Sequence, residues 1–168
     1  YVAYDKDNLI LKTKTLANEI ESLFKAKDIE QSSLLKNAKQ FGLPLEITSI
    51  SDNHNIDINL YNQTGELITS SQPSIFEKGL LSRKIHPLAY QQLSKENKTL
   101  FIQDENIGNL NYLSAYIPIR NEQGAAYAFL NLPYFANKKN VDKEISTFLV
   151  ALINVYVFLL VLATLVSL

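Results

Sequence analysis

The segment LNYLSAYIPIRNEQGAAYAFLNL, residues 110–132, decides the fold because it reads as two long strands joined by a short turn. Side chains alternate between the two faces of a strand, so each face can be read from the sequence. In residues 110–120 one face is aliphatic and consists of Leu113, Ala115, Ile117 and Ile119. The other face is rich in tyrosine and consists of Tyr112, Ser114 and Tyr116. In residues 125–132 we expect Tyr127 and Phe129 on one face, opposite Ala126, Ala128, Leu130 and Leu132. Neither face suits water, so the sequence predicts a sheet covered by a helix on one side and by a core that meets polar groups on the other.

Three further strands precede this hairpin. Residues 56–60 alternate apolar and polar side chains, and residues 66–70 return as a second strand after the turn Asn62–Gly65. Glycine at the end of that turn tolerates a positive φ, which tight hairpins require. Residues 99–103 form another strand, joined to residue 110 through the turn Asn106–Asn109. The sequence therefore predicts five antiparallel strands.

Helical periodicity begins at Asp7, where apolar residues recur at spacings of three and four over more than four turns. Two neighbouring stripes result, one made of Leu9, Thr13, Leu16, Ile20 and Leu23 and the other of Ile10, Ala17 and Phe24. This surface is wide enough to cover a sheet and also to contact a second copy of the chain. A shorter helix is predicted from Ser32 or Ser33 to Phe41, lined by Leu34, Leu35 and Ala38 and ended by Gly42 and Pro44.

The residues after that short helix are predicted to be extended. Residues 45–50 are β-prone, and SDNHN at residues 51–55 has the composition of a turn.

Pro87 suits the first turn of a helix that runs through Ala89, Tyr90 and Leu93. The fold class is therefore α+β, with a long N-terminal helix packed on a five-stranded antiparallel sheet.

The C-terminal segment FLVALINVYVFLLVLATLVSL, residues 148–168, contains no charged residue. As a helix it spans roughly 31 Å, about the thickness of the hydrocarbon core of a bilayer, which predicts a transmembrane helix. The alternative is a buried helix of a soluble core, although such a helix normally keeps a polar face. Lys138, Lys139 and Lys143 precede this segment, but they do not decide its orientation because a whole domain lies before them.

Composition excludes several classes of protein. The chain has 168 residues and a net charge of −1, which gives no support to a nucleic-acid partner. Cysteine is absent, so disulfides and thiolate chemistry are excluded. Methionine is also absent, and we therefore expect a fragment or a processed product.

These features together resemble the extracytoplasmic sensor of a bacterial membrane-bound histidine kinase, of the single Cache (PAS-like) type. The resemblance rests on the long N-terminal helix and on DINLYNQTGELITSSQP (57–73), IFEKGLLSRKIHPLAY (75–90), YIPIRNEQGAAYAFLNLPYF (116–135) and EISTFLVALINVYVFLLVLATLVS (144–167). It implies a stalk helix over residues 1–31, a Cache/PAS-like sensor domain over 32–135, a juxtamembrane linker or helix start over 136–147 and a transmembrane helix over 148–168.

The resemblance also implies a function. Binding of a small ligand or an extracytoplasmic protein would be relayed through the membrane helix to a cytoplasmic kinase that is not in this chain. We expect residues 1–147 on the periplasmic side of the inner (cytoplasmic) membrane, with membrane lipid and a second copy of the chain as further partners. The fragment itself is expected to be no enzyme and to need no cofactor, whereas the parent would be an ATP-dependent protein-histidine phosphotransferase. The alternatives are the sensor of a chemoreceptor or cyclase, a membrane-anchored binding or assembly protein, and a membrane-anchored hydrolase.

Ligand-binding residues are expected in two groups. Lys78, Arg83 and Lys84 place positive charge in the loop that borders the ligand cavity of PAS-like domains, and Arg83 suits a bidentate pair with a carboxylate ligand. The alternative is a solvated loop. The candidate pocket walls are Tyr90, Tyr112, Tyr116 and Tyr127, for which the alternative is an ordinary core.

Neither histidine predicts catalysis. His54 lies in SDNHNID, but the carboxylates and hydroxyl of a triad come from separated positions, and the glycine and glutamate of a calcium loop are missing there. His86 precedes Pro87 at the start of a predicted helix, where a capping or surface role is expected. The sequence therefore predicts no catalytic residue and no metal ligand.

Overall fold

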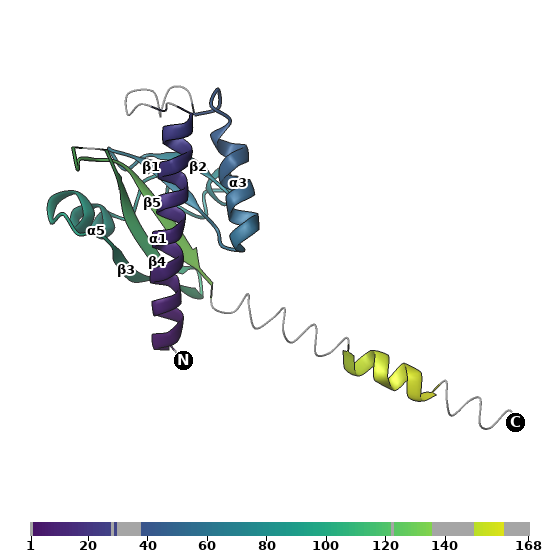
Figure 1. Ribbon diagram of the computed structural model, residues 1–168. Helices are drawn as coiled ribbons and strands as arrows, with labels where there is room; N and C mark the ends of the chain where they lie inside the picture. The colour runs from purple at the N-terminus through teal and green to yellow at the C-terminus, as the bar shows by residue number, and fades with distance from the viewer. Residues whose placement is uncertain (1, 28, 30–37, 122, 136–149, 160–168) are drawn as a thin grey trace, which may run out of the picture. The chain divides into compact units, whose positions relative to one another are not determined.

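The structure is a computed structural model that describes residues 2–27, 29, 38–121, 123–135 and 150–159. The chain divides into two compact units, Tyr1–Tyr134 and Phe135–Leu168. The first unit contains two long helices, a five-stranded sheet and several short helices in the connections (Figure 1).

The sheet contains all five predicted strands. They are β1 (Asn59–Asn62), β2 (Leu67–Ser70), β3 (Phe101–Ile107), β4 (Leu110–Arg120) and β5 (Ala126–Tyr134). Their spatial order is β2-β1-β5-β4-β3, with every neighbouring pair antiparallel, so the last strand lies at the centre. This confirms the expected arrangement of a long helix on a five-stranded antiparallel sheet. β3 is longer than predicted because Ile107 pairs with Leu110, which leaves only Gly108, at φ 60°, and Asn109 to make the turn.

Helix α1 (Val2–Ala26) covers the aliphatic face of the sheet, where it packs on β4 and β5 (Figure 1). The side chains that it buries are Leu9, Thr13, Leu16, Ala17, Ile20 and Phe24. They share one core with aliphatic residues of the sheet, namely Leu60, Ala115, Ile119, Ala128, Leu130 and Leu132. The predicted helical stripes therefore form the main core, while Ile10 and Leu23 at their edges are only half-buried.

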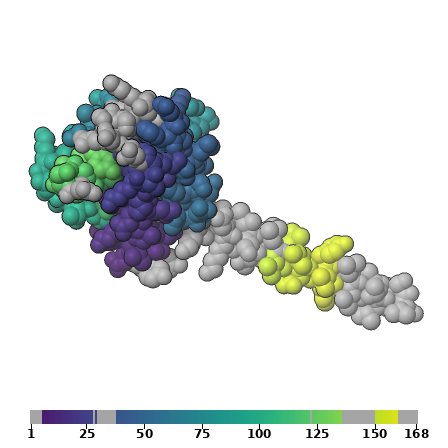
Figure 2. Space-filling view, turned by 45° about the horizontal axis from the view of Figure 1, so that its top comes forward, coloured from purple at the N-terminus to yellow at the C-terminus, as the bar shows by residue number. Residues whose placement is uncertain are grey.

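Helix α3 (Leu43–His54) corrects the prediction of a strand over residues 45–50 and a turn over residues 51–55. Its buried residues Leu43, Ile47 and Ile50 recur at helical spacing, and burying this stripe outweighs the β propensity of the isoleucines and threonine. Pro44 lies in the first turn, where its missing N–H costs nothing, so it begins a helix here. Only Asn55, at φ 49°, lies beyond the helix and caps it. Figure 2 shows α1 and α3 on the same surface of the unit.

A short helical segment lies against the other face of the sheet. Helix α5 (Pro87–Tyr90) continues into a wider turn of π-helix, η1 (Gln91–Lys95), which confirms the helix predicted from Pro87. Helix α4 (Pro73–Glu77) was not predicted. The second core, between these connections and the sheet, consists of Tyr61, Ile85, Ala89, Leu93, Tyr116 and Phe129. Both faces of the sheet are therefore covered, as the strand patterns predicted.

A β-bulge at Tyr127 reverses part of the predicted alternation in β5. Ile119 pairs with Ala128, but Arg120 pairs with Ala126, so Tyr127 has no partner across the ladder. Tyr127 consequently packs in the α1 core, with its ring centroid 6.1 Å from that of Phe24. The prediction that Tyr127 shares a face with Phe129, and Ala126 with Ala128, is wrong because the extra residue exchanges the two sides.

In the second unit the structure describes Phe135 and residues 150–159, and residues 150–159 form a helix with exposed side chains. Among the helices in the described part of the chain, none is long and apolar enough to cross a membrane. Residues 148–149 and 160–168 of the predicted membrane helix lie outside the described residues, as do residues 136–147 of the predicted linker. Most of the short helix predicted from Ser32 or Ser33 also lies outside them, and residues 38–42, at its predicted end, form turns.

Candidate functional site

The carboxylate of Glu105 lies at the centre of the hydrogen bonds on the tyrosine-rich face of the sheet. Glu105 belongs to β3, and its partner on β4 is Tyr112. The Tyr112 hydroxyl donates to Glu105 Oε2 at 3.0 Å, and the Tyr116 hydroxyl donates to Oε1 at 2.5 Å. Gln103 Nε2 donates to the same Oε1 at 2.6 Å. A half-buried carboxylate therefore receives hydrogen bonds from three uncharged donors.

Tyr61 of β1 belongs to the same group electrostatically. Burial raises its pKa above the usual value near 10, and the negative charge of Glu105 raises the pKa further. Burial is also the main cause that raises the pKa of Tyr112 and of Tyr116, followed by the charge of Glu105 and the hydrogen bonds to it. Tyr61 in turn contributes to the raised pKa of both tyrosines. We refer to Tyr61, Gln103, Glu105, Tyr112 and Tyr116 as the Glu105 cluster.

The Tyr61 hydroxyl is the member of this cluster without a hydrogen bond among the described residues. The side chain as a whole is 4% exposed. Among the described residues, Asn62 Nδ2 is the one fully buried side-chain polar atom without a hydrogen-bond partner. The Tyr61 hydroxyl oxygen has no partner either, so it is not fully buried. The Tyr61 hydroxyl is therefore unpaired among the described residues, and the charge of Glu105 acts on it.

A row of buried polar side chains crosses the same face from β2 to β4. Ser70 Oγ donates to Asn59 Oδ1 at 2.7 Å, Asn59 Nδ2 donates to Asn131 Oδ1 at 2.9 Å, and Asn131 Nδ2 donates to Ser114 Oγ at 2.7 Å. None of these four side chains is more than 5% exposed. Ser114 hydrogen-bonds in turn to Tyr116, which partly offsets the rise in the pKa of that tyrosine. This polar row is therefore continuous with the Glu105 cluster, and a register slip would leave its members unpaired.

Tyr90 of α5 also packs on this face, where it connects three segments. Its ring meets that of Phe129 edge-on, with centroids 5.7 Å apart and planes at 74°. Its hydroxyl donates to the carbonyl of Gln63 in the β1–β2 turn at 3.2 Å. The Ile85 N–H donates to the carbonyl of Gly65 in the same turn at 2.8 Å. Packing and backbone bonds together hold α5 and residues 83–85 against the sheet.

The predicted ligand-binding residues lie in different places. Tyr112 and Tyr116 are in the Glu105 cluster, Tyr90 lies on the same face but bonds to the β1–β2 turn, and Tyr127 is on the α1 face. Lys78 is exposed at the C-terminus of α4, and Arg83 is an exposed residue whose carbonyl accepts from the Leu67 N–H at 2.8 Å. Among the described residues, neither of these two cations forms an ion pair.

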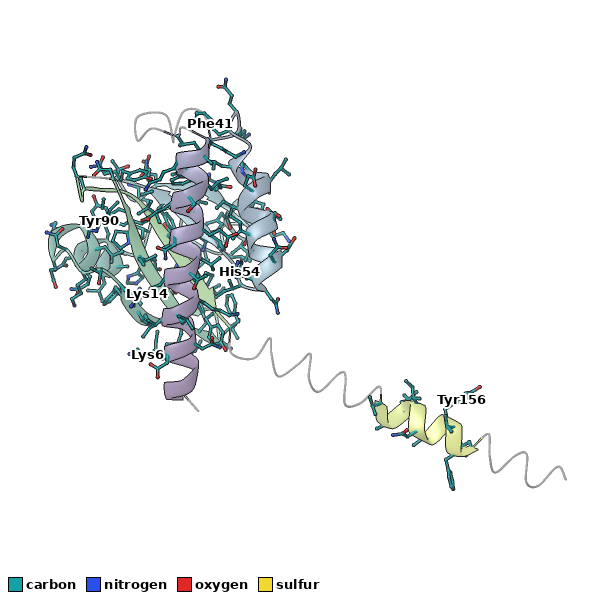
Figure 3. All side chains as sticks on the ribbon, viewed as in Figure 1. Lys6, Lys14, Phe41, His54, Tyr90 and Tyr156 are labelled. Atoms are coloured by element: carbon teal, nitrogen blue, oxygen red, sulfur yellow. The ribbon has the colours of Figure 1, made fainter. Side chains whose placement is uncertain are left out.

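The two histidines have structural partners. His54 is the last residue of α3 rather than part of a turn, and its Nε2 lies 2.9 Å from Glu19 Oε2 of α1. Figure 3 shows its position at the end of α3 beside α1. His86 caps α5, with Nδ1 accepting from the Leu88 N–H at 3.3 Å, which confirms the predicted capping role. The same view labels Tyr90 on the side of the unit away from α3.

Sequence reasoning missed Glu105, Tyr61 and the paired amides of Asn59 and Asn131. The signal for Glu105 was available in the β3–β4 turn. If Gly108 and Asn109 alone make that turn, Glu105 falls opposite Tyr112 in the ladder. Tyr61 and Asn59 also lie on the side of β1 that the alternation assigns to polar residues, but no local pattern shows that this side is buried.

This arrangement places hydrogen-bond donors and acceptors around one negative charge. Its groups are a carboxylate, hydroxyls and amides. No group of three or more histidines, aspartates and glutamates able to hold a metal ion occurs among the residues that the structure describes. The pairing of a negative charge with aromatic rings is instead suited to recognition.

No protein-family model and no curated protein matches the chain. Solved structures similar to it include the sensor domain of E. coli DcuS, at 12% identity and a TM-score of 0.47, which covers 79% of this chain and 96% of that one. Another is the sensor domain of the V. cholerae histidine kinase DctB, at 11% identity and a TM-score of 0.47, covering 73% of this chain. A third is the ligand-binding domain of the Campylobacter jejuni chemoreceptor Tlp3 in complex with L-valine, at 12% identity and a TM-score of 0.49, covering 82% of this chain. The chain spans 57% and 55% of the latter two.

Proposed function

We propose that residues 1–134 are the extracytoplasmic sensory domain of a signalling protein of the inner membrane, and that its output domain is a histidine kinase. The domain itself would bind and relay without catalysing a reaction. The observation that supports this proposal is the difference between the two faces of the sheet. One face is an aliphatic core under α1, whereas the other carries a half-buried carboxylate that accepts hydrogen bonds from buried tyrosines.

The proposed relay follows from the order of the strands. Glu105 and its tyrosine partners lie on β3 and β4, and β4 pairs with β5 from Leu113 to Arg120. β5 ends at Tyr134, after which residues 135–147 lead to the predicted membrane helix. A ligand that binds one arrangement of this hairpin more tightly would shift β5 and, through it, the membrane helix relative to α1.

A dimer formed through α1 completes the proposal. Leu11, Thr15, Asn18 and Ser22 make an exposed, uncharged stripe along a helix otherwise rich in lysine and glutamate. The hydroxyls of Thr15 and Ser22 donate to carbonyls of their own helix, so burying them against a second α1 leaves no hydroxyl donor unpaired. Leu11 is 66% exposed, and a second copy would cover it.

Cysteine cross-linking tests the dimer, since the native chain contains no cysteine. We expect Thr15→Cys in membranes to form a disulfide-linked dimer on mild oxidation. Asp52→Cys, at an exposed position of α3, is the matched control and should remain monomeric. Equal cross-linking at both positions, or at neither, would exclude α1 as the dimer interface.

A chimera tests the sensory function. The chain is fused before the cytoplasmic half of a histidine kinase with a known reporter gene, and cells are exposed to a panel of small metabolites. We expect at least one compound to change the reporter signal, and Tyr116→Phe to abolish that response. Tyr127→Phe removes the same hydroxyl on the opposite face and should leave it intact. An active chimera that ignores every compound would contradict the proposal.

A further inference from the structure

Glu105 carries a negative charge that the described residues do not balance. Their side-chain ion pairs join Lys27 to Glu46, His54 to Glu19 and Lys98 to Glu96, and none involves Glu105. Charges withdrawn from water are normally matched by an opposite charge. Here the carboxylate is satisfied only by neutral donors and keeps part of its exposure to solvent. No cation among the described residues therefore competes with a cationic ligand for this carboxylate.

The remaining hydrogen-bonding capacity of the cluster identifies what kind of cation fits. Two carboxylate oxygens offer about four acceptor positions. Oε1 accepts from Tyr116 and Gln103, whereas among the described residues Oε2 accepts from Tyr112 alone and retains room for one donor. The Tyr61 side chain is only 4% exposed, and its hydroxyl, which has no hydrogen-bond partner in the described part of the chain, adds a second acceptor. A cation with at least two N–H groups can use both.

The surrounding side chains also favour an organic cation over a metal ion or an anion. A metal ion needs several charged or strongly donating ligands, and Glu105 is the single carboxylate in the cluster. Three tyrosines line the cluster, and aromatic rings attract organic cations. An anion would face the charge of Glu105, which no ion pair among the described residues offsets.

We propose that the Glu105 cluster is a binding site for a small protonated amine, with the ammonium group held between Glu105 Oε2 and the Tyr61 hydroxyl. This inference rests on the proposed sensory function and adds the chemical class of the ligand. It also replaces the carboxylate ligand expected from Arg83 with a ligand of opposite charge.

Calorimetric titration of the full chain in detergent micelles tests the proposal with three probes that share a carbon skeleton. These are n-butylamine, n-butyrate and n-butanol, which differ in the charge of one end. We expect heat of binding from n-butylamine alone. Tetramethylammonium, a cation without an N–H, should bind about tenfold more weakly if the hydrogen bonds matter as described.

Variants locate the site. Glu105→Gln keeps the size of the side chain but removes its charge, and we expect it to weaken n-butylamine binding by about tenfold or more. Asp104→Asn is the control, because it makes the same chemical change at the neighbouring, exposed position of β3. Tyr61→Phe should weaken n-butylamine but not tetramethylammonium.

The outcomes separate this proposal from the sensory function. Unchanged n-butylamine affinity in Glu105→Gln, or binding of n-butyrate but not n-butylamine, would overturn the amine site. If the kinase chimera still responded to another compound, the sensory function would stand. A chimera without any response would contradict the sensory function, whatever the calorimetry showed.

Discussion

Gly65 should be the most sensitive glycine of the domain, because two separate costs meet there. It adopts φ +80°, and a Cβ at this position would lie 2.6 Å from Cγ2 of Ile85 and 3.4 Å from Cδ2 of Tyr90. A left-handed backbone costs about 1–2 kcal/mol for a residue with a Cβ. Carbon atoms pack at roughly 3.5–4.0 Å, so Ile85 must also move by about 1 Å, and overpacking of this kind costs about 1–3 kcal/mol.

We therefore expect Gly65→Ala to lower the free energy of unfolding by about 2–5 kcal/mol. Gly124→Ala provides the matched control, since Gly124 has φ +79° but an added Cβ there would meet no heavy atom within 4 Å. That variant should lose only the backbone cost, about 1–2 kcal/mol. The difference between the two variants isolates the contact with Ile85 and Tyr90.

Urea unfolding of the full chain in detergent micelles, followed by far-ultraviolet circular dichroism, measures both variants. The chain has no tryptophan, so the backbone signal is the natural probe. Equal losses in Gly65→Ala and Gly124→Ala would refute the reasoning, because they would mean that Ile85 is not held tightly against the β1–β2 turn. A larger loss in Gly65→Ala, with weaker ligand response, would link this turn to the position of α5.

Two further predictions concern the buried polar groups. Asn131→Ala removes the centre of the polar row, which leaves the buried Asn59 Nδ2 without its acceptor and Ser114 Oγ without the amide that donates to it. We therefore expect a loss of about 2–4 kcal/mol in urea unfolding, against less than about 0.5 for Ser22→Ala, whose hydroxyl donates to its own helix. Because the folded state raises the pKa of Tyr61 and Tyr116 above the unfolded value near 10, their contribution to stability should be constant below about pH 9 and fall as the pH rises above about 10. Absorbance at alkaline pH should show these tyrosines ionising only as the chain unfolds, and free ionisation without unfolding would contradict their burial.

Much of the fold could be predicted because its signals are local and periodic. The α1 stripe and the alternation in β4 each determine which side chains are buried, independently of distant residues. The strand predicted over residues 45–50 was wrong because that prediction considered the β propensity of each residue separately. The spacing of Leu43, Ile47 and Ile50 already indicated a helix, and the burial of that stripe decided the outcome.

The site was harder to predict because its members come from three strands, and β1 is far in sequence from β3 and β4. Tyr112 and Tyr116 were identified as candidates, since they stand on one face of one strand. Glu105 depends on the length of a turn, and Tyr61 depends on which strand neighbours β5, which no local pattern specifies. Tyr127 was predicted on the wrong face because the alternation of side chains along the sequence does not reveal a β-bulge.

That bulge has a consequence for how the length of the chain can vary. Deleting the single residue that Tyr127 adds would join Ala126 and Ala128 in a regular ladder with β4, while Ala128–Tyr134 kept their present partners. A one-residue insertion or deletion at this position therefore leaves the pairing of the rest of β5 with β4 unchanged. Related chains can differ in length at this point, and an alignment gap should be placed at the bulge rather than in the turn. The residues that reach the Glu105 cluster would then stay aligned across such a gap.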